Sequence, residues 1–346
     1  MDATGRRHIR HITCSVCSAH ALTTYSGRRI AEIRSWCDLR LVVTGGAGFI
    51  GSHFIERYAD KNDIIVMDDL SNGSLANIRS VRKRIKFLKI DISKEPSVAN
   101  LRDIEGIFHL ACHPRSFSFN RPARDVDVNV RSTINMLELA RKTDAKIVFT
   151  SNSGIYGDPK YLPMDENHPI DCKTPYDVNK YSSELHMNTY HKQYGIKTVA
   201  CRLATVYGPR QRVNEKLGWR PVVATFLEYL MQGKRPVVFG DGEQTRDLIY
   251  VTDIVRGLMA AFGSKEADGD AFNLSTGIET SINSLLTKIG ETLGKSIDPA
   301  HGPPSVGDLR RMCCSNEKAK RAFNFTINYP LDLALKEHVE WCRSAK

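Results

Sequence analysis

The sequence predicts an α/β protein with a parallel sheet that helices cover on both faces. Short apolar runs alternate with helical patterns along most of the chain, and these runs lack the apolar–polar alternation of a half-exposed strand. A sheet of such strands is buried on both sides and needs helices against each face. The chain has 346 residues, 41% hydrophobic and 25% charged, which suits one large or two linked globular domains.

Six strands are expected in the first part of the chain. They are the apolar segments 39–45, 63–69, 85–90, 106–111, 146–151 and 197–203, and helical patterns lie between most of them, including 49–59, 128–142 and 176–194. After Gly208 helices are expected near 222–231, 253–262, 282–293 and 331–343, with short strands near 236–240 and 271–275. We therefore predict a sheet domain at 39–207 and a smaller α/β lobe, mainly 208–346, with some of its elements returning to the first domain.

Residues 1–38 show no apolar periodicity and are rich in Arg, Ser, Thr and His. Seven arginines against three acids leave residues 1–40 with four of the ten net positive charges of the chain. We expect a disordered extension that is dispensable for folding. An Arg-rich presequence and an unnatural upstream start stay open as alternatives. "CSVC" (14–17) with three nearby histidines lacks a second spaced Cys or His pair, so we predict no metal.

The composition also limits the partners. No apolar run approaches the roughly 18 residues of a membrane span, and basic residues are not interleaved with aromatic ones in the way that favours nucleic acid. Nine cysteines without regular spacing favour reduced thiols and a cytoplasmic location. We expect neither membrane nor nucleic-acid binding, and the positive charge outside the first 40 residues suits a small anionic ligand.

A glycine-rich turn predicts a dinucleotide site. "TGGAGFIGSH" (44–53) follows the first strand and opens a helix, with Gly45, Gly48 and Gly51 at a three-then-three spacing. Such glycines let the backbone approach a pyrophosphate, whose charge then faces a helix N-terminus. Asp68 closes the second strand where a carboxylate can bind a ribose diol and repel a 2′-phosphate, so NAD is favoured over NADP. Asp91, which ends the third strand, can reach the adenine. These features make the predicted sheet a Rossmann-type doubly wound one.

A tyrosine–lysine pair predicts the chemistry. "YDVNK" places Tyr176 and Lys180 at i and i+4, on one face of a helix. The ammonium favours the phenolate and is expected to lower the pKa of the tyrosine from its usual value near 10 toward neutrality. The phenolate can then take a proton from a substrate hydroxyl while hydride leaves the same carbon. The polar stretch "TSNSGIYG" (150–157) ends the fifth strand, where open α/β sheets place their ligands, and should face this pair.

These motifs resemble the extended short-chain dehydrogenase/reductase superfamily, and within it the NAD-dependent nucleotide-sugar epimerase/dehydratase family. The matching stretches are "TGGAGFIG", "FHLA", "DVNV", "SGIYGDP", the Tyr176–Lys180 pair, "VYGPR", "GDGEQTRDLIYVTD" (240–253), "FNLSTG" and "GDLRR" (307–311). The resemblance covers about residues 39–343. It implies a Rossmann domain that holds NAD permanently, a small lobe that holds a nucleoside diphosphate sugar, and a homodimer built from paired helices.

By position, the resemblance also implies further site residues. For NAD it implies contacts at Phe49, Ile50, Ile92, Leu110, Ala111 and Asn129. For the substrate it places Phe239 near the base, Arg246 near the diphosphate and Asp308 near a ribose. Arg115 can meet a sugar carboxylate. Thr205 and Ser305 stand where the family often has an asparagine and an arginine at the diphosphate, so we expect phosphate binding to be weaker or differently shaped.

Asn152 is the departure from the family that lies nearest to the chemistry. The family usually has a Ser or Thr here, whose hydroxyl bridges the substrate hydroxyl and the tyrosine. An amide can donate a hydrogen bond to that oxygen, but it cannot relay a proton as a hydroxyl does. Either Ser151 or Ser153 takes over this role, or Tyr176 acts directly.

The residues favour epimerisation at C4 of a UDP-sugar. Dehydratases of the family usually carry an acidic pair where Ser153 and Gly154 stand, and decarboxylases a glutamate at Gly154, so we find nothing in that role to remove a carbon-bound proton. Oxidation at C4, rotation of the keto sugar and reduction from the other face need only the cofactor, one base and orientation. The sugar stays open between UDP-glucose or galactose and their N-acetyl and uronate relatives. The alternatives are a catalytically silent NAD- or nucleotide-sugar-binding protein and a dehydratase or decarboxylase of the same family.

Overall fold

The computed structural model describes residues 37–94, 101–213, 220–304 and 309–344. The expectations for residues 1–36, for Ser305 and for Asp308 therefore lie outside the described residues. Residues 38–346 form one compact unit, and the description below concerns that unit.

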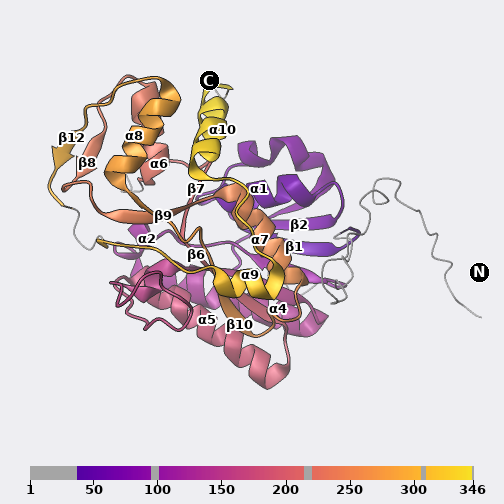
Figure 1. Ribbon diagram of the computed structural model, residues 1–346. Coiled ribbons are helices and arrows are strands. Elements are labelled where there is room, and N and C mark those ends of the chain that lie inside the picture. The colour runs from indigo at the N-terminus through magenta and orange to yellow at the C-terminus, as the bar shows by residue number, and fades with distance from the viewer. Residues whose placement is uncertain (1–36, 95–100, 214–219, 305–308, 345–346) are drawn as a thin grey trace, which may run out of the picture. The chain divides into compact units, whose positions relative to one another are not determined.

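A seven-stranded parallel sheet forms its centre (Figure 1). The strands are β1 (Arg40–Thr44), β2 (Asp63–Asp68), β3 (Ile85–Lys89), β4 (Gly106–His109), β5 (Lys146–Asn152), β6 (Thr198–Leu203) and β10 (Asp270–Leu274). Their order is β10-β6-β5-β4-β1-β2-β3, which confirms the predicted doubly wound fold. From β1 the strands β2 and β3 are added toward one edge of the sheet, and β4, β5 and β6 are added toward the other. The strand order therefore reverses between β1 and β4, where Val43 lies opposite Phe108. Open α/β sheets bind their ligands beyond the carboxyl ends of the strands at such a point.

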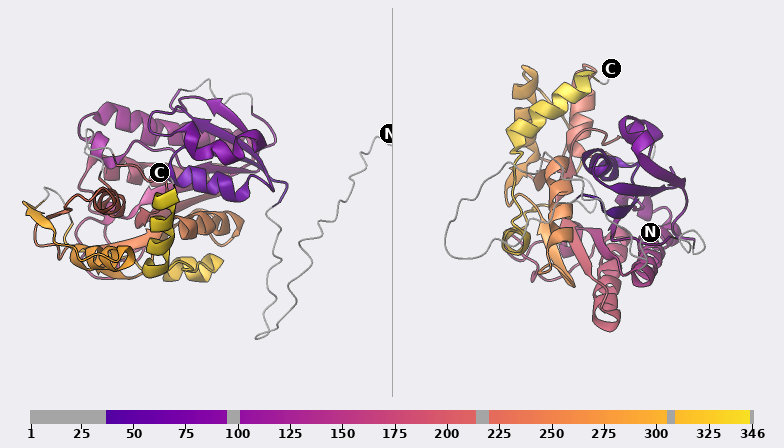
Figure 2. Two further views of the ribbon diagram at one scale, coloured as in Figure 1. Left: turned by 90° about the horizontal axis from the view of Figure 1, so that it is seen from above. Right: turned by 90° about the vertical axis from the view of Figure 1, so that its right-hand side faces the viewer.

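In the described part of the chain, helices lie against both faces of the sheet (Figure 2). They are α1 (Phe49–Tyr58), α4 (Ser132–Thr143), α5 (Pro175–Tyr194) and α7 (Val251–Gly263). Successive side chains of a strand point to opposite faces. Phe108 of β4 therefore packs between Phe54 of α1 and Phe262 of α7, at ring-centroid distances of 4.1 and 5.4 Å. Its neighbour Ile107 belongs to the core cluster on the other face, together with Met187 of α5.

The smaller lobe is built from short strands and helices that follow β6. Its two small sheets have the orders β11-β9-β7 and β12-β8. Their strands are β7 (Thr205–Tyr207), β8 (Val237–Phe239), β9 (Thr245–Tyr250), β11 (Glu279–Ser281) and β12 (Ala300–Gly302), and the helices of the lobe are α6 (Val222–Met231), α8 (Ile282–Leu293) and α10 (Leu331–Ser344). Buried side chains from these helices and from β7, β8 and β9 form one apolar cluster.

Short helical elements connect the main ones. They are η1 (Leu75–Arg84), α2 (Arg115–Ser118), α3 (Pro122–Val126), η3 (Asp127–Arg131), η4 (Ser153–Tyr156) and α9 (Glu317–Phe323). The predicted boundary between the domains at 207 and 208 stays a prediction.

Local sequence signals fix where α5 begins and ends. Thr174 caps the helix, because its hydroxyl oxygen accepts a hydrogen bond from the backbone N–H of Asp177 at 3.2 Å. Pro175 occupies the first helical position, where no backbone N–H is needed. Gly195 ends the helix with a φ of +70°. This start places Tyr176 in the first turn, at the cavity described below, and Lys180 one turn further along.

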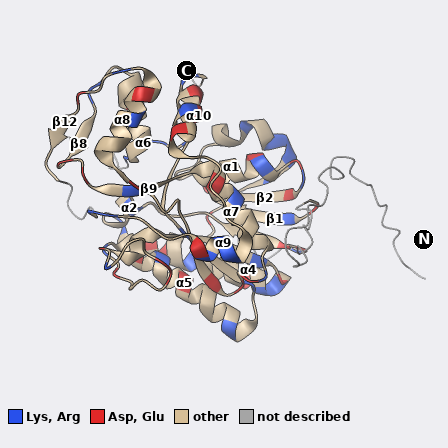
Figure 3. Ribbon diagram, viewed as in Figure 1, with Lys and Arg blue, Asp and Glu red and all other residues tan. Residues whose placement is uncertain are grey.

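Charged residues are interspersed on the surface of the described chain. In Figure 3 basic and acidic residues alternate around α5 and α9. On α9, Lys318 pairs with Asp270 and Lys320 with Glu317. Within the described ranges, no helix combines the length and the apolar composition needed to cross a bilayer.

Candidate active site

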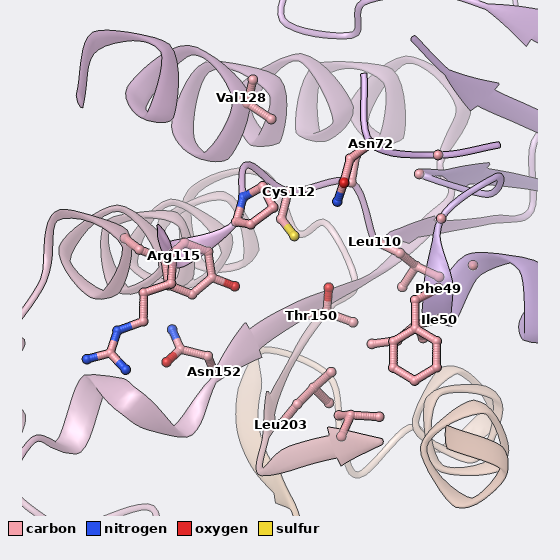
Figure 4. A pocket seen from close by; sticks show the side chains of 18 of the residues that line it. Phe49, Ile50, Asn72, Leu110, Cys112, Arg115, Val128, Thr150, Asn152 and Leu203 are labelled. Atoms are coloured by element: carbon pink, nitrogen blue, oxygen red, sulfur yellow. The ribbon is translucent and has the colours of Figure 1, made fainter. Parts of the chain in front are cut away.

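A cavity of about 430 Å³ runs along the carboxyl ends of the parallel strands (Figure 4). Of the residues singled out from the sequence, the following line it: Gly45, Gly48, Phe49, Ile50, Gly51, Asp68, Asp91, Ile92, Leu110, Ala111, Arg115, Ser151, Asn152, Ser153, Tyr176 and Thr205. The glycine turn and the Tyr176 region, far apart in sequence, thus share one space.

Four expected residues do not line this cavity, and Lys180, described below, is one of them. Phe239, on β8 of the smaller lobe, is 36% exposed. Arg246 donates hydrogen bonds to the carbonyl oxygens of Thr245 and Leu309 at 2.6 and 2.9 Å. Asn129 is buried and does not line the cavity. The roles implied for these residues stay proposals.

The glycine turn has no room for side chains. Gly45 has a φ of +68°, and a Cβ there would lie 2.7 Å from the Cα of Ala111. A Cβ on Gly51 would lie 2.3 Å from the carbonyl oxygen of Gly45. Gly48 is the N-cap of α1 and offers no side-chain cap, so the N–H groups of the first turn are directed outward from the helix end. Phe49 and Ile50 begin this helix at the cavity wall (Figure 4).

Two acidic residues, Asp68 and Asp91, line the cavity together with the glycine turn. Asp68 is 8% exposed and accepts hydrogen bonds from the backbone N–H groups of Ala47 and Leu70 at 2.9 and 2.8 Å. Burial raises the pKa of Asp68, against these two hydrogen bonds. Asp91 accepts hydrogen bonds from Ser93, and the Arg124 guanidinium lies 3.0 Å from it. These contacts outweigh its desolvation and lower its pKa.

The predicted Tyr176–Lys180 pair lies in the first two turns of α5. Tyr176 is half-buried and lines the cavity. Lys180 is 1% exposed, and its ammonium nitrogen lies 4.0 Å from the centroid of the Phe149 ring on β5. Burial lowers the pKa of Lys180 to about 8. Burial and the nearby Lys180 charge lower the pKa of His109 to about 3, so this histidine is neutral.

The expected direction of the tyrosine pKa was wrong. Desolvation raises the pKa of Tyr176 well above 10, and the carboxyl groups of Asp177 and Asp125 add to this. The i, i+4 spacing predicted a stabilised phenolate, but it carries no information on how deeply the hydroxyl is enclosed. In the protein the loss of hydration is the largest cause, and the neighbouring Cys112, Asp177 and Asp125 act in the same direction.

The end of β5 presents three polar side chains to the cavity. The Asn152 Oδ1 accepts a hydrogen bond from the N–H of Gly154 at 2.6 Å, while its buried Nδ2 has no partner in the described structure. Ser153 donates to the Met312 sulfur at 3.5 Å. Ser151 is 3% exposed, and its hydroxyl likewise has no partner among the described residues. Asn152 therefore has two N–H donors left for an oxygen in the cavity.

Cys112 and Asp177 are among the lining residues that the sequence analysis missed. Cys112 directly follows Leu110 and Ala111 and lines the cavity, but no motif includes it. Asp177 was quoted only as a spacer in "YDVNK". A Cβ on Gly154 would lie 2.7 Å from Oδ1 of Asp177. The Asp177 carboxyl group therefore occupies the space that a side chain at residue 154 would need. Its Oδ1 is buried and has no partner in the part of the chain that the structure describes.

Comparison with known proteins decides the family. Residues 41–275 match the sequence model of the "NAD dependent epimerase/dehydratase family". The chain belongs to this family. A putative UDP-glucose 4-epimerase of Methanocaldococcus jannaschii is 36% identical over 310 residues, which are 88% of this chain and 98% of that protein. The UDP-glucose 4-epimerase of Mycolicibacterium smegmatis is 36% identical over 314 residues, 88% of this chain and 99% of the relative.

A solved structure has the same fold. The UDP-glucose 4-epimerase of Thermotoga maritima, solved with UDP-glucose, is 34% identical and superposes with a TM-score of 0.84 over 89% of this chain and 99% of that one. The resemblance inferred from the motifs is confirmed.

Asp68 provides a prediction on cofactor choice. Replacing Asp68 with alanine should weaken NAD by about 10- to 100-fold relative to NADP, because it removes a charge-assisted hydrogen bond to the ribose and a repulsion of the 2′-phosphate. The measurement is the ratio of the two nucleotides released on denaturation, by mass spectrometry, after purification with equal amounts of both. Asp68→Asn, which keeps an acceptor for the backbone N–H of Ala47, controls for distortion of the turn. If the wild-type protein takes up both nucleotides equally, Asp68 does not select NAD.

Proposed function

We propose that this protein is an NAD-dependent 4-epimerase of a UDP-sugar. One observation carries the proposal: Tyr176 and the Ser151–Ser153 end of β5 share a cavity whose other end is the glycine turn with Asp68. The close turn at Gly45 and Gly51, the N-terminus of α1 and the buried carboxylate of Asp68 fit the pyrophosphate and ribose of NAD. When bound, NAD supplies the acceptor and donor of hydride.

The residues of the chain then bind, orient and move a proton. Tyr176 takes the proton of the sugar C4 hydroxyl as the hydride leaves C4, and returns it when the keto group is reduced from the other face. Lys180, largely protonated at neutral pH with its pKa of about 8, favours the phenolate. The free N–H groups of Asn152 hold the sugar oxygen. Relatives that act on UDP-glucose support the nucleotide and the reaction.

One observation favours a second candidate. The Asp177 carboxyl group stands beside Gly154, so the cavity wall does hold an acid near the place where the sequence analysis found none. A carboxylate there suits removal of a proton from carbon next to a keto group, as dehydration requires. Its second oxygen accepts a hydrogen bond from the Thr174 hydroxyl at 2.6 Å as part of the helix cap, and this structural role keeps epimerisation the first proposal.

The experiment is a product analysis with the purified protein. UDP-glucose, UDP-N-acetylglucosamine and UDP-glucuronate are incubated separately, and the products are identified by NMR and mass spectrometry. We expect conversion of at least one sugar to its C4 epimer at unchanged mass. Loss of water or carbon dioxide would establish the dehydratase or decarboxylase alternative. Sugars that bind but stay unchanged would establish the silent binder.

Two further expectations belong to the proposal. A homodimer is supported by Val178 and Leu185 of α5, which share one helix face at i and i+7 and are 53% and 52% exposed. Light scattering of the purified protein tests it.

A cytoplasmic location is supported by the free thiols of all seven cysteines in the described residues, and fractionation of cells tests it.

Lys180 provides a prediction on pH. Lys180→Met should lower kcat and raise the pH at which activity appears by about 1 unit or more, because the ammonium that favours the Tyr176 phenolate is lost. In the wild type this support declines as Lys180 loses its proton above about pH 8. Profiles of kcat/KM against pH for both proteins measure the shift. Lys146→Met is the matched control, since Lys146 is also buried but pairs with Asp268 outside the cavity. An unchanged profile in Lys180→Met would remove Lys180 from the mechanism.

A further inference from the structure

The Lys180 ammonium lies against an aromatic ring and not beside a carboxylate. Its nitrogen is 4.0 Å from the centroid of the Phe149 ring, and both side chains are almost fully buried. The charges that raise its pKa, those of Cys112, Glu184 and Asp125, act through Coulombic attraction, and no hydrogen bond contributes. Within the described residues, the ring of Phe149 is thus the group that directly holds this ammonium.

The two nearby carboxylates are committed to other partners. Glu184 pairs with Arg202 at 2.8 Å. Asp125 accepts hydrogen bonds from the amide groups of Asn129 and Asn179 at 2.8 and 2.5 Å. A buried charge without a partner is costly. The face of an aromatic ring carries a negative potential, which attracts a cation most strongly where water is excluded. A ring can therefore stand in for the missing counter-ion.

A histidine with a fixed orientation packs against the Phe149 ring. His109 stacks on it at a centroid distance of 5.6 Å and an interplanar angle of 28°. The Thr44 hydroxyl oxygen already accepts two backbone hydrogen bonds, at 3.1 and 3.2 Å, so its O–H donates to His109 Nδ1 at 2.8 Å. The other ring nitrogen then carries the proton and donates to Thr133 Oγ1 at 3.1 Å. This neutral ring holds Phe149 without repelling the ammonium.

These contacts connect the cofactor turn to the lysine across the sheet. Thr44 ends β1 directly before the glycine turn, and His109 and Phe149 lie on β4 and β5, the next two strands of the sheet. Lys180 reaches this row of buried groups from α5. The ammonium is therefore positioned from the sheet and not by a neighbour on its own helix.

We propose, resting on the epimerase function proposed above, that Phe149 is a positioning residue whose ring face holds the Lys180 ammonium in place and in its charged form. This charge favours the Tyr176 phenolate, so Phe149 acts on proton transfer although it does not line the cavity. A ring with a weaker negative face destabilises the ammonium relative to the neutral amine. The pKa of Lys180 then falls, and the alkaline loss of activity moves to lower pH.

Fluorinated phenylalanines at residue 149 test this contact, because fluorine withdraws electron density from the ring face and nearly keeps the shape. Phe149 is replaced by mono-, di- and trifluorophenylalanine in the full-length holoenzyme. NMR of the protein labelled with [¹³C]lysine follows the Lys180 titration, and Lys180→Met assigns the signal. Its midpoint should fall stepwise, by about 0.5 to 1.5 pH units in all. The alkaline limb of kcat/KM should move equally, whereas a ring that only fills space would leave both unchanged.

Phe272 provides the matched control. The Lys318 ammonium lies 4.8 Å from the centroid of its ring, outside the cavity, and also pairs with Asp270. The same fluorinated series at Phe272 should leave the Lys180 midpoint and the pH profile unchanged. Phe149→Leu removes the ring and should shift the midpoint at least as far as the trifluorinated ring does. Should this variant fail to fold, the fluorinated series, which keeps the packing, carries the measurement.

The outcomes separate the two proposals. A Lys180 midpoint that stays constant across the fluorinated series would overturn the positioning role and leave the epimerase standing. A wild type that binds NAD but converts none of the sugars would overturn the proposed function and, with it, the role of Phe149 in catalysis. The NMR titration would still decide whether the ring holds the ammonium.

Discussion

We expect the Tyr176→Phe variant to lose about a thousandfold or more of the wild-type kcat while it still carries NAD. Phenylalanine keeps the ring in the cavity wall and removes only the hydroxyl, which is the proposed proton acceptor. The measurements are kcat, the nucleotide released on denaturation, and the melting temperature.

Two companion variants define the result. Tyr190→Phe, on the same helix, removes a hydroxyl that donates to Glu138 at 2.8 Å outside the cavity, and it should leave kcat unchanged. Asn152→Ala should cost less than Tyr176→Phe, on the order of 1–3 kcal/mol for one hydrogen bond to a reacting oxygen. Normal turnover by Tyr176→Phe would disprove the mechanism.

The sheet could be predicted because its strands are short apolar runs with clear limits. All six strands expected up to residue 203 are present, and the stretch near 271–275 returns to the large sheet as β10. The spacing of Gly45 and Gly51 predicted the tight turn after β1, because a Cβ at either position would meet backbone atoms. These features depend on residues near one another in sequence, where pattern and sterics decide the structure.

The parts that sequence reasoning missed depend on tertiary packing. The separation of Tyr176 and Lys180 fixed their shared helix face, but the depth of burial reversed the expected pKa direction of the tyrosine. Asn129 holds the backbone of His113, a contact that its motif did not predict, and its role toward the cofactor stays a prediction. Asp177 reaches the space beside Gly154 from a different element. Contacts of this kind join residues that no short motif contains.

A buried ion pair between Arg202 and Glu184 supports the segment 150–157, which carries Asn152, through a hydrogen bond to Tyr156. Arg202 of β6 and Glu184 of α5 are 7% and 6% exposed, and their closest N–O distance is 2.8 Å. Arg202 also donates to the hydroxyl of Tyr156 at 2.9 Å, and that hydroxyl donates to Asn273 at 2.8 Å. Tyr156 lies in "TSNSGIYG", four residues beyond Asn152. The pair therefore joins β6 and α5, and through Tyr156 it also positions the segment that carries Asn152.

Removing one member of this pair should have a large effect on stability. Glu184→Ala leaves the Arg202 guanidinium buried without its carboxylate, and we expect the free energy of unfolding to fall by about 3–5 kcal/mol. Urea denaturation followed by circular dichroism measures the loss. Asp298→Ala is the control, because it breaks the exposed Arg235–Asp298 pair and should cost less than about 1 kcal/mol.

The double variant Glu184→Met with Arg202→Leu separates the charge from the packing. Since it leaves no buried ion, it should lose less stability than Glu184→Ala although it changes two residues. It also removes the donor to Tyr156, so kcat should fall while the fold persists, because the turn that carries Asn152 and Ser153 loses its support. A Glu184→Ala variant as stable as Asp298→Ala would show that Arg202 finds water or another acceptor, and that the pair does not hold the loop.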